Sequence, residues 1–288
     1  MRWLSKLPMI GSAVTWLMAT HFWRAYRHML QVKWTRLAAA ITFTSFVALF
    51  PLLTVAAAIG AGLLSDSQLR QLQRKIAEQL PGISGQLDLT ALVSNAATVG
   101  LVAGVALLFT GIGWVASLRD CLCAVWEKDD EEPNFFLAKL RDGALLLGLG
   151  GVVLLSFGCS AFATMAVSRV ADAIGLSRHG VGEALLSAAG FCVAVLADFL
   201  LLTYVLAKLP CTRPPRHAVV TAALLGAIGF ELLKLLLGSY LRDVAARSMY
   251  GAFGTPIALL LWINFTAKLL VYCASWTATT GEQNKTRV

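Results

Sequence analysis

The sequence predicts an all-α membrane protein with six transmembrane helices, and three observations support this fold class. Of its 288 residues, 58% are hydrophobic and only 14% are charged, with a mean hydropathy of +0.72. Six long runs contain few or no charged residues. Each run reaches the roughly 20 apolar residues that a helix needs to cross a hydrocarbon core about 30 Å thick. Because lipid offers the backbone no hydrogen-bond partners, such runs must be helical.

These runs form one membrane domain. The predicted spans occupy about residues 37–65, 90–118, 143–168, 184–207, 218–237 and 255–277. They lie within a domain at 37–281, between an N-terminal segment at 1–36 and a tail at 282–288. The links between the spans are too short for a separate soluble catalytic domain.

The distribution of basic residues predicts the orientation. The N-terminal segment, the second and fourth links and the tail hold 15 of the 24 Lys and Arg residues, and the other three links hold 7. The positive-inside rule then places both termini in the cytoplasm. Anionic lipid headgroups account for the net charge of +8, so we expect membrane lipids as partners and no nucleic acid.

The N-terminal segment contains an uncharged stretch at 7–23. Pro8, Ser12 and Thr15 dilute its apolar character, and no clear signal-peptide cleavage site follows. A seventh span would reverse the charge bias. We therefore predict a short interfacial helix with tryptophans at headgroup depth.

Two further features concern the early spans and their first link. Pro51 lies near the middle of the first span, where it removes one backbone hydrogen bond and favours a kink or hinge. Leu69, Leu72 and Ile76 form one stripe in the external link at 66–88, which predicts a short amphipathic helix that ends at Pro81. This helix either lies on the outer leaflet or acts as a lid.

Small residues are frequent in the second and third spans, for example Gly100-x-x-x-Gly104, Gly111 and Gly148. Small faces let helices approach closely in lipid, so these are predicted to be packing glycines. The Gly100–Gly104 face also permits a homo-oligomer.

The last span has a predicted start. Thr255 suits an N-cap and Pro256 suits the first helical position, after a flexible lead-in at Gly251 and Gly254.

The six cysteines are not expected to form disulfides. Cys121, Cys123 and Cys211 fall on the predicted cytoplasmic side, where thiols stay reduced. A zinc site made by these three is the alternative, but the C-x-C spacing is poor and no fourth ligand is evident. The acidic run Glu127–Glu132 fits no calcium loop and is interpreted as a solvated hairpin. We expect no metal and no cofactor.

Ionisable residues inside the spans are the functional candidates, because each costs about 2.5–3.5 kcal/mol or more unless it has a partner or faces a cavity. At about 1.5 Å per residue, Asp198 and Lys268 fall at the same depth in the inner half of the bilayer. We predict that they form a pair across the fourth and sixth spans, with Asn264 one turn further out.

In the fifth span, Glu231 and Lys234 are three residues apart and are predicted to pair in the outer half. Both pairs either hold the late spans together or line a polar route through them.

The segment AAAITFTSFVALFPL at 38–52 resembles the first span of the YihY/BrkB family of bacterial inner-membrane proteins, as do MYGAFGTP at 249–256 and LLLW at 259–262. The chain departs from the family where the last span typically closes with Gly-Ala-Glu, since it has Cys273-Ala274-Ser275. The resemblance implies six spans and an inner-membrane location. Some members of the family have virulence or serum-resistance associations. The resemblance also implies a transport or envelope-lipid role.

We therefore expect a transporter or lipid-handling protein, with a non-transporting scaffold for the envelope as the alternative. We expect no enzyme. The family was long labelled ribonuclease BN, but His21, His28, His179 and His217 are scattered and form no metal-binding cluster in the sequence.

Overall fold

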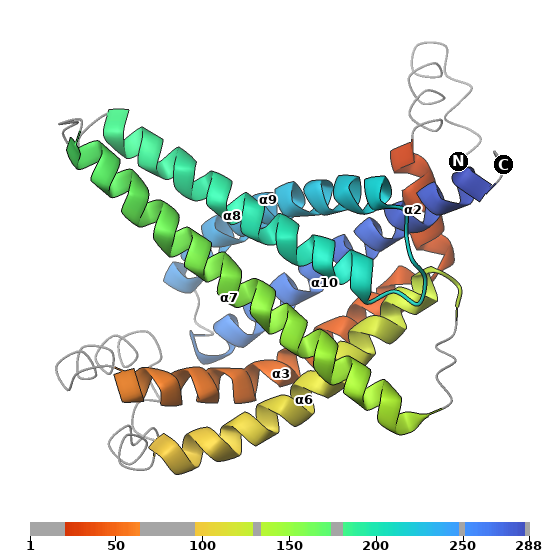
Figure 1. Ribbon diagram of the computed structural model, residues 1–288, viewed down its shortest axis with the longest axis horizontal. Helices are drawn as coiled ribbons and strands as arrows, with labels where there is room; N and C mark the ends of the chain where they lie inside the picture. The colour runs from red at the N-terminus through yellow and green to blue at the C-terminus, as the bar shows by residue number, and fades with distance from the viewer. Residues whose placement is uncertain (1–20, 64–95, 129–133, 174–180, 248–250, 286–288) are drawn as a thin grey trace.

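Figure 1 shows the computed structural model of the chain, which describes residues 21–63, 96–128, 134–173, 181–247 and 251–285. These residues form helices and contain no strand. The helices are α2 (His21–Gln31), α3 (Trp34–Leu63), α6 (Ala96–Val125), α7 (Phe135–Ala173), α8 (Val181–Lys208), α9 (Arg216–Arg247) and α10 (Gly251–Lys285). The predicted external helix, and the predicted interfacial helix up to residue 20, lie outside the described residues.

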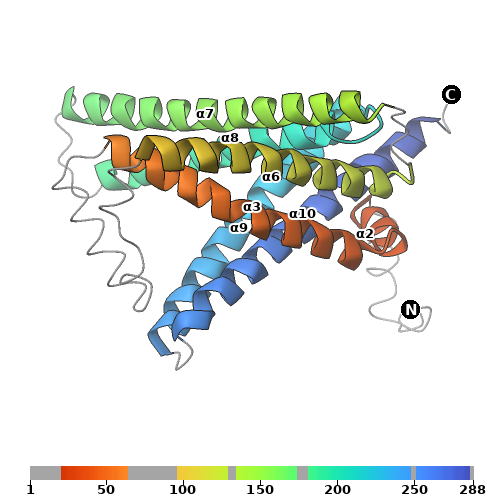
Figure 2. The ribbon, with the colours of Figure 1, turned by 90° about the horizontal axis from the view of Figure 1, so that it is seen from below.

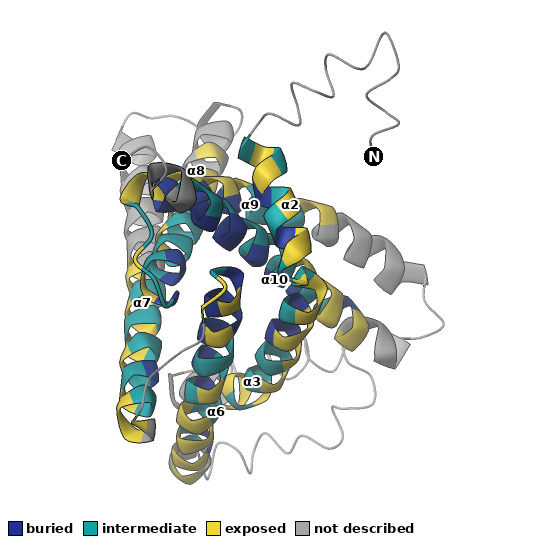
Figure 3. Cartoon of the chain, turned by 90° about the vertical axis from the view of Figure 1, so that its right-hand side faces the viewer, coloured by how far each residue is buried: buried dark blue, intermediate teal, exposed yellow. Residues whose placement is uncertain are grey.

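Six of these helices form a closed ring. α3 packs against α6, α6 against α7, α7 against α8, α8 against α9, α9 against α10, and α10 against α3 again. Figure 3 looks along this ring, and Figure 2 shows that α9 and α10 lean steeply across the direction of α6, α7 and α8. Residues from all six of these helices border one cavity inside the ring.

Five helices in the described parts of the chain are long and apolar enough to cross a membrane. The qualifying stretches are Trp34–Val55, Gly100–Val125, Gly190–Lys208, Arg216–Leu236 and Pro256–Thr280. The predicted span at 143–168 coincides with α7, which is 39 residues long but is not among these five. The all-helical membrane fold is confirmed, and the count of six spans stays a prediction.

The start predicted for the last span is wrong. α10 begins at Gly251, so Thr255 is not its N-cap and Pro256 lies inside the helix. Gly251 and Gly254 are helical and do not form a loop before the span. The reason is physical: in an apolar setting even glycine backbone groups gain by hydrogen bonding within a helix.

Tightly packed side chains gather at one end of the ring. Leu122, Leu206, Leu209 and Val271 are at most 2% exposed and join the ends of α6 and α8 to the middle of α10. Elsewhere the ring helices expose large apolar side chains, such as Phe109 at 83%. Apolar side chains on the outside are the surface expected of helices that face lipid.

The packing role predicted for the glycines holds at two positions. A Cβ added at Gly111 would press on Leu146, and one at Gly148 would overlap the hydroxyl of Tyr204, which donates a hydrogen bond to the Leu145 carbonyl at 3.1 Å. No atom lies within 4 Å of such a Cβ at Gly104. A larger residue at either position would have to displace Leu146 or Tyr204, so glycine allows the close approach of α7 to α6 and α8.

The expectation that all cysteines stay reduced is contradicted. Cys123, near the end of α6, and Cys211, in the turn between α8 and α9, form a disulfide with their Cα atoms 5.2 Å apart. Cys121 is free and buried, and its thiol donates to the Leu37 carbonyl. The two bonded cysteines are 88 residues apart, so only the ring arrangement reveals that they meet.

Helix α2 packs against the closely packed end of the ring and forms hydrogen bonds with it. Its Ala25 and Met29 are buried. His28 Nε2 donates to the Val125 carbonyl at the end of α6, at 2.8 Å, and so satisfies a carbonyl without an intrahelical partner. His21 Nε2 lies 2.8 Å from Thr280 Oγ1 and 3.3 Å from the Trp276 carbonyl on α10. The first turn of α2 and the end of α10 therefore lie side by side.

The attachment of α2 to α10 is predicted to weaken in mild acid. Burial lowers the pKa of His21 from its usual 6.5, and the Arg24 charge adds to this effect although the Trp276 carbonyl opposes it. Because the docked state disfavours protonation, its stability is complete above pH 6.5 and declines as pH falls below that value. The hydrogen–deuterium exchange rate of residues 21–31, corrected for the intrinsic rate, should increase as the pH is lowered from 7.5 to 5.5.

The matched control is His21→Gln, which keeps a polar side chain and does not titrate. It should flatten this pH dependence. Equal pH dependence in the wild type and His21→Gln would show that another group controls the docking of α2.

Candidate functional site

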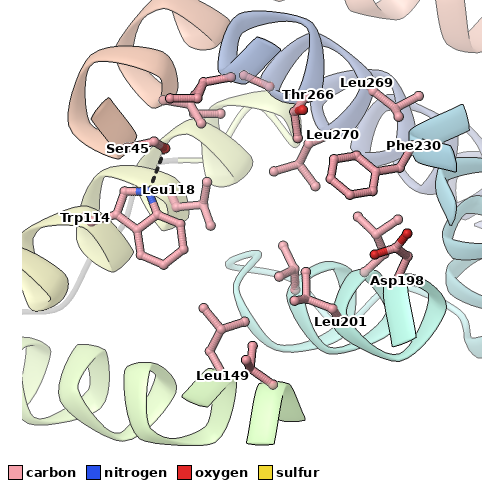
Figure 4. A pocket seen from close by; sticks show the side chains of 16 residues that line it. Ser45, Trp114, Leu118, Leu149, Asp198, Leu201, Phe230, Thr266, Leu269 and Leu270 are labelled. Atoms are coloured by element: carbon pink, nitrogen blue, oxygen red, sulfur yellow. Dashed lines mark hydrogen bonds between the residues drawn. The ribbon is translucent and has the colours of Figure 1, made fainter. Parts of the chain in front are cut away.

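A cavity of about 320 Å³ occupies the middle of the ring, and we name it the central chamber. All six ring helices contribute to its wall, which is almost wholly apolar. Figure 4 shows Leu118 of α6, Leu149 of α7, Leu201 of α8 and Phe230 of α9 around it. Its few polar side chains therefore decide what it can bind.

A second cavity, of about 330 Å³, adjoins the central chamber. The two share Ser45, Trp114, Ile263 and Thr266, and the second cavity extends along α3 to Leu52. Trp114 Nε1 donates to Ser45 Oγ at 2.8 Å. The Oγ1 atom of Thr266 is buried without a hydrogen-bond partner. The two cavities together provide an elongated apolar space with weakly polar groups where they meet.

One carboxylate faces the central chamber, and it belongs to a three-residue charge cluster. Lys234 Nζ lies 2.9 Å from Asp198 Oδ2 and 2.8 Å from Glu231 Oε1. The side chains of Asp198, Glu231 and Lys234 are 18%, 10% and 36% exposed. Of the three, Asp198 borders the chamber, on the opposite side of the ring from Ser45 (Figure 4). We name these three residues the lysine–carboxylate cluster.

The lysine–carboxylate cluster is charged and only partly exposed to solvent. Two carboxylates share one ammonium group, so the cluster has a formal charge of −1 when all three groups are ionised. Charged groups out of water are stabilised only by close partners and hydrogen bonds. The arrangement can therefore accept a cationic or hydrogen-bond-donating group that enters the chamber beside Asp198.

The structure confirms one predicted ion pair and corrects the other. Glu231 and Lys234 pair as expected. Asp198 pairs with Lys234 and not with Lys268, whose Nζ lies 5.4 Å from the ring centre of Trp34 and 5.2 Å from that of Phe265.

The error comes from counting depth along upright helices. Asp198 is about 15 Å from the end of α8 and Lys234 about 27 Å from the start of α9, yet they touch. Because α9 is tilted relative to α8, a longer stretch of α9 is needed to reach the depth that a shorter stretch of α8 reaches (Figure 2).

The remaining predicted residues lie away from the chamber. Asn264 Nδ2 donates to Thr42 Oγ1 at 3.1 Å and so joins α10 to α3. Pro51 lies within α3, which continues to Leu63. Asn264, Lys268 and Pro51 border neither cavity. The polar route expected through the fourth to sixth spans is thus an apolar chamber with one charged cluster at its edge.

Sequence reasoning missed a second buried ion pair, between α6 and α7. Arg119 Nη1 lies 3.3 Å from Asp142 Oδ1, and the two side chains are 5% and 1% exposed. Both residues adjoin the uncharged runs and lie at the two ends of the predicted link between the second and third spans. The available signal was their position: opposite charges next to the facing ends of consecutive spans are expected to meet when the spans form a hairpin.

No group of three or more His, Cys, Asp or Glu residues that could hold a metal ion occurs among the residues whose placement is described.

The fold and the chamber define the class: a polytopic α-helical membrane protein with an apolar internal cavity. The family described as "Virulence factor BrkB" matches residues 25–288, and the chain belongs to this family.

Two relatives match most of the chain. The chain is 28% identical to the inner membrane protein YhjD of Escherichia coli (strain K12) over 279 residues, which are 93% of this chain and 83% of that protein. It is 30% identical to an uncharacterized protein of Dickeya dadantii (strain 3937) over 90% of this chain and 82% of that protein.

A UPF0761 membrane protein of Methylibium petroleiphilum is 30% identical over 78% of this chain and 54% of its own length. The chain thus spans about half of that longer relative. No solved structure matches the chain.

The lysine–carboxylate cluster predicts unequal effects of its members. Lys234→Met leaves two adjacent carboxylates without a cation, whereas Asp198→Asn leaves the Lys234–Glu231 pair in place. Breaking a fully buried pair costs about 3–5 kcal/mol, and the partial exposure of Lys234 reduces that figure here. Thermal unfolding in detergent should show a lower midpoint for Lys234→Met than for Asp198→Asn. A larger loss for Asp198→Asn would contradict the shared-lysine arrangement.

The Arg119–Asp142 pair predicts a rescue. Asp142→Leu leaves a buried guanidinium without this carboxylate and should destabilise the protein by about 3–5 kcal/mol. Adding Arg119→Met should restore much of the loss, because an apolar pair needs no desolvated charge. The measurement is the recovery of monodisperse protein after heating in detergent. Asp120→Leu, which removes an exposed carboxylate 3.8 Å from Arg119 Nη2, is the comparison and should cost much less, because a solvated ion pair contributes little.

Proposed function

We propose that this protein binds a lipid or another amphipathic molecule in the central chamber and moves it within or across the inner membrane. The observation that supports the proposal most directly is the chamber itself: six helices border an apolar cavity, and among its described lining residues Asp198 is the charged one. The proposal involves no chemical step.

The size and chemistry of the space fit such a ligand. Small-molecule sites usually occupy about 300–1,000 Å³ and combine apolar walls with a few placed polar groups. The two adjoining cavities, of about 320 and 330 Å³, extend this space along α3. An acyl or other hydrocarbon chain suits the walls, while a headgroup that donates hydrogen bonds or carries positive charge suits Asp198.

A small hydrated ion fits the chamber poorly. Conducting pores replace the hydration shell with rings of carbonyls or charged side chains. Here the described wall offers Asp198, Ser45, Thr266 and the Trp114 indole, and the rest is hydrocarbon. The apolar wall therefore favours the lipid over the small solute.

We also propose that all six ring helices span the inner membrane, with α2 and the end of α10 on the cytoplasmic side. α7 lies in the ring between α6 and α8, both of which have stretches suited to crossing. The basic N-terminal segment and the His21 contacts with Thr280 support placing both termini on one side.

The test is native mass spectrometry of the protein released from nanodiscs of bacterial lipid. Val153 borders the chamber, while its neighbour Leu154 is 73% exposed and faces outward. Val153→Trp fills the chamber and should remove a co-purifying lipid. Leu154→Trp adds the same bulk to the outer surface and should keep it. Asp198→Asn should reduce retention by weakening recognition of the headgroup.

Retention of the same species by the wild type and Val153→Trp would contradict the proposal. If no sample, including the wild type, holds a lipid under conditions that preserve the fold, the envelope scaffold becomes the better explanation.

A further inference from the structure

Lys268 is an unusual residue within the bundle. Lys234 contacts two carboxylates, whereas Lys268 has no acidic side chain within ion-pair distance among the residues that the structure describes. Its ammonium group instead lies over the rings of Trp34 and Phe265. Cations within membrane spans usually pair with an opposite charge or extend to the interface, so this half-buried lysine needs an explanation.

The side chain of Lys268 does not border the central chamber and instead reaches Trp34 at the start of α3. Thr266, Ala267, Leu269 and Leu270 border the central chamber, and Lys268 does not. On the same face of α10, one and two turns earlier, Phe265 and Leu261 are each 43% exposed. Residues three, four and seven apart share one face of a helix. Lys268 therefore ends an outward-facing apolar stripe, where the acyl region of the bilayer is expected.

Aromatic residues indicate the depth of Lys268. Trp34 is the first residue of α3, and its ring lies against Lys268. One turn further along α10, the Tyr272 ring packs 5.2 Å from that of Phe22, and its hydroxyl donates to the Phe22 carbonyl at 3.4 Å. Trp and Tyr concentrate at the border between hydrocarbon and headgroups. Counted along α10, Lys268 lies at the middle of the crossing stretch Pro256–Thr280, but α10 is tilted (Figure 2), and the ammonium group lies over Trp34, the first residue of the crossing stretch of α3. The Trp34 contact therefore places the ammonium group towards the headgroup level.

We propose that Lys268 binds the phosphate of an anionic phospholipid on the outer surface of α10. The ammonium group forms a charge-assisted hydrogen bond with a phosphate oxygen, Trp34 borders the headgroup, and an acyl chain lies along Phe265 and Leu261. The exposed Lys33, in the turn before Trp34, adds positive potential.

A lipid fits better than free phosphate because the apolar stripe continues directly from the cation. This site is separate from the central chamber and does not depend on the function proposed for it.

The experiment titrates delipidated protein in detergent with phosphatidylglycerol and, in parallel, with phosphatidylcholine, and counts bound lipids by native mass spectrometry. Lys268→Met should weaken the first phosphatidylglycerol binding roughly fivefold, the effect of one basic residue at an anionic surface. Lys268→Arg should retain most of the affinity. The matched control is Lys208→Met, which removes one charge from the exposed end of α8. It should bind as the wild type does.

Three results would overturn the proposal. The first is wild-type affinity in Lys268→Met, and the second is an equal loss in Lys208→Met, which would indicate non-specific charge. The third is displacement of the lipid by millimolar inorganic phosphate, which would show a site for the phosphate group alone. Asp198→Asn should keep this affinity, so failure of the chamber proposal would be distinguishable from failure of this one.

Discussion

The ring depends on the ammonium group of Lys234, which lies between the carboxylates of Asp198 and Glu231. In a setting with little water, neither carboxylate is stable without the ammonium group, so the cluster fixes the register of α8 against α9. The same ammonium group lies 4.9 Å from the ring centre of Phe230, which borders the chamber. The cluster thus joins α8 to α9, lies beside an aromatic part of the wall and places a carboxylate at the edge of the cavity.

The two ends of the ring are held differently. At the end near α2, buried apolar side chains, the Arg119–Asp142 pair, the Cys123–Cys211 disulfide and the α2 contacts act together. Further along the described helices, large apolar side chains face outward and the two cavities begin. A bundle fixed at one end can change its spacing at the other at small cost, because helices in lipid are held by local packing and polar contacts rather than by exclusion of water.

Much of the fold follows from uncharged runs, since a membrane imposes length and helicity on each of them. Contacts within one helix were also predictable: Glu231 and Lys234 are three residues apart, and their pairing needs no knowledge of the tertiary structure. Contacts between helices depend on the tilt of each helix and on its position in the ring. The composition of the sequence determines neither. The assumption of upright helices matched Asp198 with Lys268, and the real geometry matched it with Lys234.

Other features were hidden for the same reason. Nothing in the local sequence of Cys123 or Cys211 shows that the end of α6 meets the turn after α8. The wall of the chamber consists of apolar residues such as Leu118 and Leu149. The same residue types face lipid elsewhere on the helices. Which face of a helix turns inward is decided by the neighbours, so an apolar cavity leaves no motif in a sequence that is apolar throughout.

The charges inside and outside the ring differ in sign, and this difference bears on selectivity. The chamber presents Asp198 from a cluster with one excess negative charge, whereas the outer surface of α10 presents Lys268 with no acidic neighbour in the described structure. At short range in a weakly screened medium, like charges repel and opposite charges attract strongly. On the two proposals made above, an anionic headgroup would therefore be favoured at Lys268 and disfavoured at Asp198. A headgroup carrying an ammonium or hydroxyl group gains in the chamber. The two sites together would sort lipids by headgroup charge before any movement takes place.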